Sequence, residues 1–284
     1  MKIDYIVTHD GILKEYLKEL GLSRRFMKKV KLYGKMYIND NEVKNYFPIK
    51  EGDKITLEYY EEENDNIVSK NKALNICYED EHILIINKQE SLAVQPSLKH
   101  YEENVVSYVK GYFKDQNITS NVHIVNRLDY ATSGLMIVAK DGFTHHALTK
   151  EKIITRKYYA VVQGILISKE GTINLPIKRE SEDSFGNIRR MVSPDGKEAI
   201  THYKVLKESN EKNISLVDIK LDTGRTHQIR VHFNALGHPL VGDKIYGEES
   251  DRLYLHCYHL SFINPYNLKE IVIEEKPDFI DELL

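Results

Sequence analysis

Hydrophobic residues recur with a helical period in the first part of the chain. Three leucines stand four and three residues apart, at Leu13, Leu17 and Leu20. Because Gly21 follows them, this spacing predicts a short amphipathic helix that stops at the glycine. A second helix is expected to begin at a cap on Ser23 and to end at Gly34. Its predicted buried face consists of three large hydrophobic residues, Phe26, Val30 and Tyr33.

The next hydrophobic residues come in short runs typical of strands. Such runs occupy 36–39 and 54–57, each beside a turn signal. Acidic and polar residues without periodicity then fill 61–74, and a stretch of that kind predicts a flexible linker. We therefore expect a small α+β unit at residues 1–60 and a larger unit at residues 75–284.

The larger unit combines many strand patterns with few helical ones. Strands are predicted at 76–78, 83–86, 134–139, 157–163, 201–206 and 215–221. Helices are predicted at 104–113 and 143–152. A last helix, capped by Thr226 and closed by Gly237, is expected to bury Ile229, Phe233 and Leu236. Because strands and helices do not alternate regularly, the pattern predicts an α+β fold with a mixed, mostly antiparallel sheet.

Composition limits the class of protein. The chain has 284 residues, 41% hydrophobic and 29% charged, which is the balance of a soluble globular protein. No apolar run approaches the roughly 20 residues that a membrane helix needs, and the start MKIDYIVTHDG lacks the apolar core of a secretory signal. Cys77 and Cys257 are too few for a disulfide framework, and His227 and His232 are spaced by five rather than the four of the zinc motif. We therefore expect a cytoplasmic protein that neither binds a metal nor spans a membrane.

Charge is concentrated locally. The net charge of −3 argues against a protein that coats nucleic acid indiscriminately. Between positions 14 and 35, however, eight lysines and arginines stand against two glutamates. The cations on the second predicted helix that we expect to contact RNA phosphates are Arg24, Arg25, Lys28 and Lys29. Most charged runs are merely solvated helix faces, so both interpretations stand on the sequence alone.

Polar chemistry is concentrated before the predicted strand at 134–139. Asn126, Arg127 and Asp129 precede its unbroken apolar run. A loop entering a buried strand holds a catalytic carboxylate firmly, because the scaffold fixes the backbone while the side chain reaches a cleft. An aspartate just before Thr-Ser-Gly is also a common turn former. Spacing alone does not decide between these roles for Asp129.

A family resemblance shifts the balance towards catalysis. The segment Arg-Leu-Asp-x-x-Thr-Ser-Gly at 127–134 resembles the signature of the RluA-type pseudouridine synthases. The segments RKYYAV at 156–161 and GRTHQIRVH at 224–232 resemble the second and third motifs of this family. GKxAxT at 196–201, HPLVGD at 238–243 and LxLH at 253–256 follow in the family order, so the resemblance extends from about residue 75 to the C-terminus. Asn126 and Gln95 depart from the family pattern, in which many members have histidine.

The N-terminal unit has a weaker resemblance of its own. Leu-Ser-Arg-Arg at 22–25, Gly34 with Ile38-Asn39, and Gly52-Asp53 with Ile55 resemble the small RNA-binding fold of ribosomal protein S-four. That fold presents a pair of helices to structured RNA. The resemblance implies that residues 1–60 form an appended RNA-binding domain.

The resemblance implies the chemistry at the centre of the site. Asp129 would be the catalytic carboxylate, either as nucleophile at the sugar or as base towards it. Arg230 would pair with Asp129, since an adjacent guanidinium favours the charged carboxylate. Tyr158 would stack on the target uracil. In the plainer alternatives Arg230 forms an ordinary surface salt bridge and Tyr158 is a core residue.

The resemblance also implies contacts with the substrate. Arg127 would fill the stack that the flipped uridine vacates, or contact a phosphate. Leu255 would pack against the uracil, although an ordinary core leucine fits the pattern nearly as well. Arg225 and His227 would contact the RNA backbone.

These residues together imply an RNA pseudouridine synthase that modifies ribosomal RNA as a monomer, without a cofactor. Two alternatives stay open on the sequence: a non-catalytic RNA-binding or ribosome-assembly factor that kept the fold, and a nucleoside hydrolase that uses the same carboxylate. The hydrolase would release free uracil, whereas the binding factor would leave pseudouridine levels unchanged when Asp129 is replaced.

Overall fold

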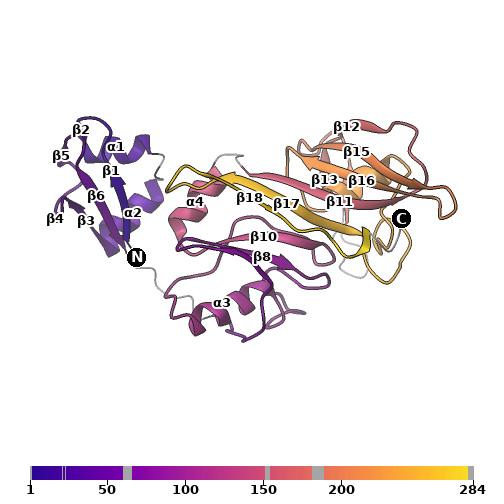
Figure 1. Ribbon diagram of the computed structural model, residues 1–284, viewed down its shortest axis with the longest axis horizontal. Coiled ribbons are helices and arrows are strands. Elements are labelled where there is room, and N and C mark those ends of the chain that lie inside the picture. The colour runs from indigo at the N-terminus through magenta and orange to yellow at the C-terminus, as the bar shows by residue number, and fades with distance from the viewer. Residues whose placement is uncertain are drawn as a thin grey trace.

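The computed structural model describes residues 2–20, 22, 24–59, 66–150, 154–180 and 189–280 (Figure 1). Residues 2–59 form an antiparallel four-stranded sheet in the order β1-β6-β3-β4, with a short β2–β5 pair and two helices beside it. The elements are β1 Lys2–Ile6, β2 Gly11–Ile12, α1 Leu13–Glu19, α2 Arg24–Tyr33, β3 Gly34–Ile38, β4 Asn41–Glu42, β5 Pro48–Ile49 and β6 Lys54–Tyr59.

Both predicted N-terminal helices are present. Leu13 and Leu17 of α1 and Phe26 and Val30 of α2 are buried against the sheet. Tyr33 was wrongly predicted to be buried: it is 57% exposed, because α2 ends there and the chain turns directly into β3. The predicted helix stop at Gly21 and cap at Ser23 lie outside the described residues.

The rest of the chain is built on a ten-stranded sheet. Its main path is β12-β15-β16-β11-β17-β10-β8-β7, with β18 paired to β17 and β9 to β10. Among these described strands β10 and β17 pair in parallel and the other pairs are antiparallel. The elements are β7 Ile76–Glu79, β8 Ile83–Lys88, α3 Val105–Asp115, β9 His123–Ile124, β10 Ser133–Ala139, α4 Gly142–Lys150, β11 Thr155–Gln163, β12 Glu170–Asn174, β13 Ile177–Arg179, β14 Arg190–Val192, β15 Ile200–Ser209, β16 Ile214–Leu221, α5 Gln228–Ala235, β17 Leu255–Ile263 and β18 Glu270–Glu274.

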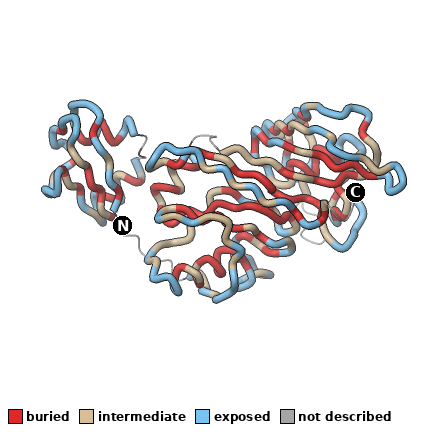
Figure 2. The backbone as a smooth tube through the Cα atoms, viewed as in Figure 1, coloured by how far each residue is buried: buried red, intermediate tan, exposed pale blue. Residues whose placement is uncertain are grey.

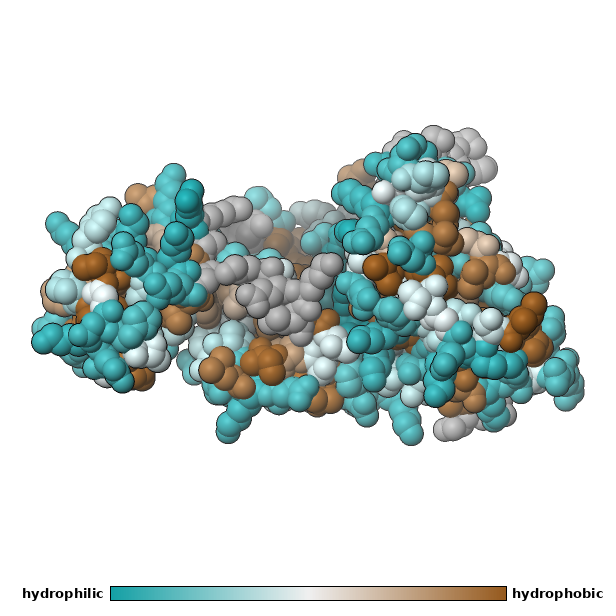
Figure 3. Space-filling view, turned by 90° about the horizontal axis from the view of Figure 1, so that it is seen from above, coloured by the Kyte–Doolittle hydropathy of each residue, from teal (hydrophilic) through white to brown (hydrophobic). Residues whose placement is uncertain are grey.

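This architecture confirms the α+β fold with a mixed, mostly antiparallel sheet. Buried backbone follows the central strands of the large sheet, while exposed segments lie at its edges and turns (Figure 2). Hydrophilic side chains cover most of the face seen in Figure 3, and hydrophobic ones form separate patches on it. Among the described helices, none is long and apolar enough to cross a membrane.

Strand β10 is an interior strand of the large sheet, between β17 and β8. All seven of its residues are buried, as the unbroken apolar run predicted. Gly134 pairs with Cys257 of β17, directly after the Ser133–His256 pair, and has a φ of +115°. A Cβ atom at this position would collide with the backbone of Cys257, so the close approach of the two strands requires glycine.

The start and end of α5 differ from the prediction. Thr226 was wrongly expected to cap the helix; the N-cap is His227, whose φ of 57° is left-handed and cannot continue a helix backwards. Leu236, expected to be buried, is 41% exposed because it is the C-cap, beyond the last turn that faces the sheet. Gly237 then turns the chain with a φ of +81°, as its glycine identity predicted.

Candidate active site

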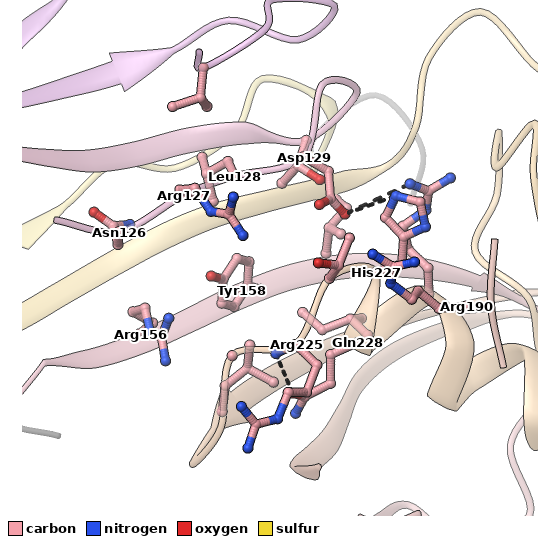
Figure 4. Close-up of a pocket in the computed structure, with 18 of the residues that line it drawn as sticks. Asn126, Arg127, Leu128, Asp129, Arg156, Tyr158, Arg190, Arg225, His227 and Gln228 are labelled. Atoms are coloured by element: carbon pink, nitrogen blue, oxygen red, sulfur yellow. Dashed lines mark hydrogen bonds and ion pairs between the residues drawn. The ribbon is translucent and has the colours of Figure 1, made fainter. Parts of the chain in front are cut away.

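A pocket of about 690 Å³ lies where the loop before β10, strand β11 and the start of α5 meet. Asp129 lines it, with its side chain 25% exposed. All seven residues predicted for catalysis and substrate contact line this pocket: Arg127, Asp129, Tyr158, Arg225, His227, Arg230 and Leu255. Segments separated by about a hundred residues in the sequence therefore converge on one carboxylate (Figure 4).

The Asp129 loop is anchored to β10 by Asn126. The buried Asn126 side chain accepts a hydrogen bond of 2.7 Å from the Ile137 backbone N–H and donates one of 3.3 Å to the Leu135 carbonyl. The loop then closes on itself, because the Thr132 backbone N–H donates to the Asp129 carbonyl at 3.1 Å. Asn126, which departs from the family pattern, thus ties the loop to β10. Gln95, the other departure, also lines the pocket.

A buried lysine, Lys88, is hydrogen-bonded to the same loop. Lys88, 2% exposed, donates hydrogen bonds of 2.8, 3.0 and 3.2 Å to the carbonyls of Gln89, Leu92 and Tyr130. Burial lowers the pKa of Lys88 to about 7, against the opposing effects of the nearby Asp129 and Glu90 carboxylates. Sequence reasoning missed this residue, since a lysine is seldom fully buried.

Arg230 has two acidic neighbours. Its Nη1 lies 3.7 Å from Oδ2 of Asp129, so the predicted neighbours do meet. Its closer partner is the fully buried Asp243, which accepts 2.7 Å and 2.6 Å hydrogen bonds from Nε and Nη2. Burial opposes both charges, but the pairing outweighs it, raising the pKa of Arg230 and lowering that of Asp243. Asp243 thus holds Arg230 through Nε and Nη2, and Nη1 lies near Asp129.

The alternative for Arg230, an ordinary salt bridge on the solvent side of α5, is excluded, because Arg230 is only 4% exposed. The role of Asp243 was not predicted, although its segment was among those that resemble the family. Nothing in its spacing from Arg230, 13 positions along the chain, indicates the contact.

His227 lies near the same carboxylate oxygen as Arg230. Its Nε2 lies 4.0 Å from Oδ2 of Asp129, and its Nδ1 lies 2.9 Å from the Tyr246 hydroxyl. That hydroxyl accepts a 2.8 Å hydrogen bond from the Arg190 backbone N–H. Burial lowers the pKa of His227, an effect that Asp129 opposes only in part. A neutral imidazole with a fixed orientation therefore borders the carboxylate.

Tyr158 and Leu255 form the buried wall of the pocket. They are 5% and 3% exposed, on the neighbouring strands β11 and β17. Burial raises the pKa of Tyr158 well above its usual value, and the adjacent Cys257 thiol adds to the effect. The hydroxyl is therefore protonated at neutral pH and the ring presents an apolar surface.

Arginine side chains line the pocket on two sides. Arg127 and Arg156 lie on one side of the pocket and Arg190 on the other in the view of Figure 4. Neither Arg156 nor Arg190 was predicted as a site residue, although Arg156 belongs to a segment that resembles the family. The four cations predicted to contact RNA elsewhere lie on α2, outside this pocket; Arg24, Lys28 and Lys29 are exposed, and the Arg25 side chain lies outside the described part of the chain.

Comparison with known proteins identifies the family. The family described as RNA pseudouridylate synthase matches residues 82–235. The chain belongs to the RNA pseudouridylate synthase family. An uncharacterized RNA pseudouridine synthase of Bacillus subtilis, YjbO, is 41% identical over 261 residues, covering 89% of this chain and 90% of that protein. This membership confirms the resemblance of the larger unit to pseudouridine synthases.

Two further relatives bear on the family members' substrates and fold. Ribosomal large subunit pseudouridine synthase D of Buchnera aphidicola from Schizaphis graminum is 35% identical over 271 residues, covering 87% of this chain and 84% of its own. The solved structure of human RNA pseudouridylate synthase domain containing 1 is 26% identical and covers 75% of this chain and 86% of its own, with a TM-score of 0.61. Family membership favours an RNA isomerase over the non-catalytic alternative.

Proposed function

We propose that this pseudouridine synthase isomerises specific uridines in ribosomal RNA and that Asp129 is its catalytic carboxylate. The observation that carries the proposal is the position of Asp129: it lies in a pocket, on a loop anchored to β10, with the Arg230 guanidinium and the His227 imidazole both near its Oδ2. The ribosomal substrate is supported by the name of the relative from Buchnera aphidicola, a ribosomal large subunit pseudouridine synthase.

The reaction breaks the bond between N1 of uracil and C1′ of the sugar and forms a bond from C5 to C1′. The proton on C5 is lost and N1 gains one, so electrons and atoms balance without a redox partner. Asp129 acts at the sugar, as nucleophile at C1′ or as base towards it, with the Arg230 guanidinium 3.7 Å from its Oδ2. Because nothing is oxidised or reduced, we propose that the chain acts without a cofactor.

The detached uracil must be held while it turns. Tyr158 is proposed to stack on the ring, and its protonated hydroxyl to exchange a proton with the base. Leu255 supplies the adjacent apolar surface. A closed apolar wall beside the carboxylate keeps water from intercepting the cleaved sugar, which is what separates an isomerase from a hydrolase.

The target uridine reaches this pocket only after it leaves the RNA stack, at a cost of a few kcal/mol. Arg127 is proposed to occupy the vacated position, since a planar guanidinium can stack in place of a base. Arg225 and His227 are proposed to hold the flipped nucleotide through its backbone or sugar.

We further propose that residues 1–60 form an S-four-like RNA-binding domain joined by a linker at 61–74 to the catalytic domain at 75–284. The separate four-stranded sheet of residues 2–59 and the exposed cations of α2 support this division. The whole chain is proposed to act as a cytoplasmic monomer.

The test maps pseudouridines across total RNA from cells with the gene, without it, and complemented with Asp129→Asn. The exchange keeps the volume and the hydrogen-bonding reach of the side chain but removes its charge. The rate of pseudouridine formation at the gene-dependent site should therefore fall by on the order of 10⁴-fold. A modification that persists in the Asp129→Asn cells would refute the catalytic role of Asp129. No gene-dependent pseudouridine in the total RNA of otherwise matched cells would refute the enzyme assignment.

A further inference from the structure

We propose that a basic groove beside the active site binds the phosphodiester backbone of the RNA strand that flanks the target uridine. This inference rests on the proposed function and extends it from the flipped nucleotide to its neighbours. The groove, here called the hairpin groove, has a volume of about 400 Å³ and lies between the β13–β14 hairpin and the loop at 224–226. Among the cations of this groove, the sequence analysis predicted contact with the RNA backbone for Arg225 alone.

The hairpin groove is continuous with the active-site pocket. Arg190, Gly224, Arg225 and Thr226 line both cavities. A strand whose uridine lies beside Asp129 therefore leaves the pocket along this wall. Consecutive phosphates of that strand come within reach of the side chains that line the groove.

Charge in the hairpin groove is strongly one-sided. The described residues that line it include five cations, Lys178, Arg179, Arg190, Lys197 and Arg225, and one carboxylate, that of Asp195. The Asp195 side chain is 88% exposed and its carboxylate lies 3.9 Å from Lys178, so water screens most of its charge. The excess of positive charge fits a polyanion better than a neutral or zwitterionic ligand.

Among the described residues, the lining of a second cavity beside the site lacks this excess. It adjoins the active-site pocket through Val125, Asn126, Arg156 and Leu221, and its charged lining is two cations and one carboxylate, Arg156, Lys220 and Asp222. The electrostatic attraction is therefore asymmetric about Asp129. We infer that one side of the target strand is held mainly by phosphate contacts in the hairpin groove.

The groove is held in a defined shape before any ligand binds. The backbones of Ile177 and Lys197 exchange hydrogen bonds of 2.9 Å and 2.8 Å, which fixes Lys197 beside the hairpin strand that carries Lys178. Gly196 makes this approach possible, because a Cβ atom there would lie 2.6 Å from the Ile177 backbone. On the facing wall, Arg225 donates a 2.8 Å hydrogen bond from Nε to the Glu198 carbonyl. Preorganised cations lose less entropy when they bind phosphate.

The test compares Lys178→Gln combined with Lys197→Gln against a matched control, Lys114→Gln combined with Lys204→Gln. Both pairs remove two positive charges, but Lys114 and Lys204 are exposed on α3 and β15 and line neither cavity. Binding of a 12-nucleotide oligouridylate and of a transcript around the mapped uridine is measured by fluorescence anisotropy from 50 to 300 mM salt. Equal thermal unfolding temperatures confirm that each variant is folded.

We expect the groove variant to bind both RNAs about 10-fold more weakly at low salt and to lower the slope of log affinity against log salt by about 1.4, which is about 0.7 for each lost phosphate contact on a single strand. The control should keep the wild-type slope. A groove variant whose slope equals the control's overturns the inference. Affinities for both RNAs that stay at the wild-type values overturn it as well. Because oligouridylate binding requires no isomerisation, failure of the groove is distinguished from failure of the proposed enzyme activity.

Discussion

The Nδ1 atom of His227 lies 2.9 Å from the hydroxyl of Tyr246, and this contact orients the imidazole beside Asp129. The Tyr246 hydroxyl already accepts a hydrogen bond from the Arg190 backbone N–H. Its own proton is available to Nδ1, and we therefore assign Nδ1 as the acceptor in a neutral ring. The Nε2 atom then carries the hydrogen and points it towards Asp129, 4.0 Å away.

His227 should consequently serve the reaction as a hydrogen-bond donor beside the carboxylate. His227→Ala is expected to lower kcat by about 10²-fold, the usual effect of losing one preorganised donor. His227→Gln keeps an N–H near the same position and should recover most of the rate. Tyr246→Phe removes the hydroxyl beside Nδ1, so the ring proton is no longer held on Nε2. This variant should lower kcat more than it raises KM.

Single-turnover pseudouridine formation measures these rates. Equal rates for the alanine and glutamine variants would contradict the donor role. A loss confined to KM in the Tyr246→Phe variant would contradict the assigned tautomer.

The Arg230–Asp243 pair is expected to contribute to folding as well as to the site. Asp243→Asn leaves the Arg230 guanidinium, 4% exposed, without the closer of its two anionic partners. Removing one partner of such a buried pair typically costs about 3–5 kcal/mol of unfolding free energy. Urea denaturation should show this loss for Asp243→Asn, whereas the exposed Asp195→Asn should change the unfolding free energy by less than about 0.5 kcal/mol. Equal midpoints for the two variants would show that the pair is not a major stabilising contact.

Lys88 predicts a specific dependence of stability on pH. In the unfolded chain a lysine keeps its proton up to a pKa of about 10.4, whereas the folded pKa of Lys88 is lowered to about 7 by burial. Between these values the unfolded state binds more protons, so the folded state gains stability as pH rises, by up to about 1.4 kcal/mol per pH unit. Stability at pH 9 should therefore exceed that at pH 7 by about 2 kcal/mol from this group alone.

Lys88→Met removes this contribution, and its stability should rise less between pH 7 and pH 9 than that of the wild type. The exposed Lys204→Met serves as the control and should follow the wild-type curve. Urea unfolding at both pH values gives the difference directly. Parallel curves for wild type and Lys88→Met would show that the ammonium keeps its ordinary pKa in the fold.

The elements predicted correctly are those whose signal is local. The apolar run of 134–139 is long enough for a strand and too short for a membrane helix, and it forms the fully buried β10. The catalytic motifs could likewise be read from short segments that resemble a family. Asp129, Tyr158 and Arg230 therefore meet at one pocket as expected.

What the sequence did not predict depends on contacts between distant positions. The start of α5 is set by Gln228, whose side chain accepts hydrogen bonds from the Arg225 N–H and the Thr223 hydroxyl and donates to the Ile200 carbonyl. These hydrogen bonds from distant residues, and not a local cap at Thr226, determine where the helix begins. Lys88 and Asp243 were missed for a related reason: burial of a charge is visible only when its partners are known.

The basic face of α2 gives a prediction for the N-terminal unit. Phe26 and Val30 bury one side of this helix, while Lys28 and Lys29 are exposed. If residues 1–60 bind RNA, Lys28→Gln combined with Lys29→Gln should weaken binding of the mapped transcript and lower its salt slope by about 1.4.

This effect should add to that of the hairpin-groove variant, because Figure 1 shows α2 and β13 at opposite ends of the molecule and distant sites act independently. Fluorescence anisotropy on the combined four-site variant checks additivity, with Lys114→Gln and Lys204→Gln again as the matched loss of charge. A slope unchanged by the α2 substitutions would mean that these lysines form only a solvated helix face. In that case the RNA affinity of the chain would arise from the catalytic unit.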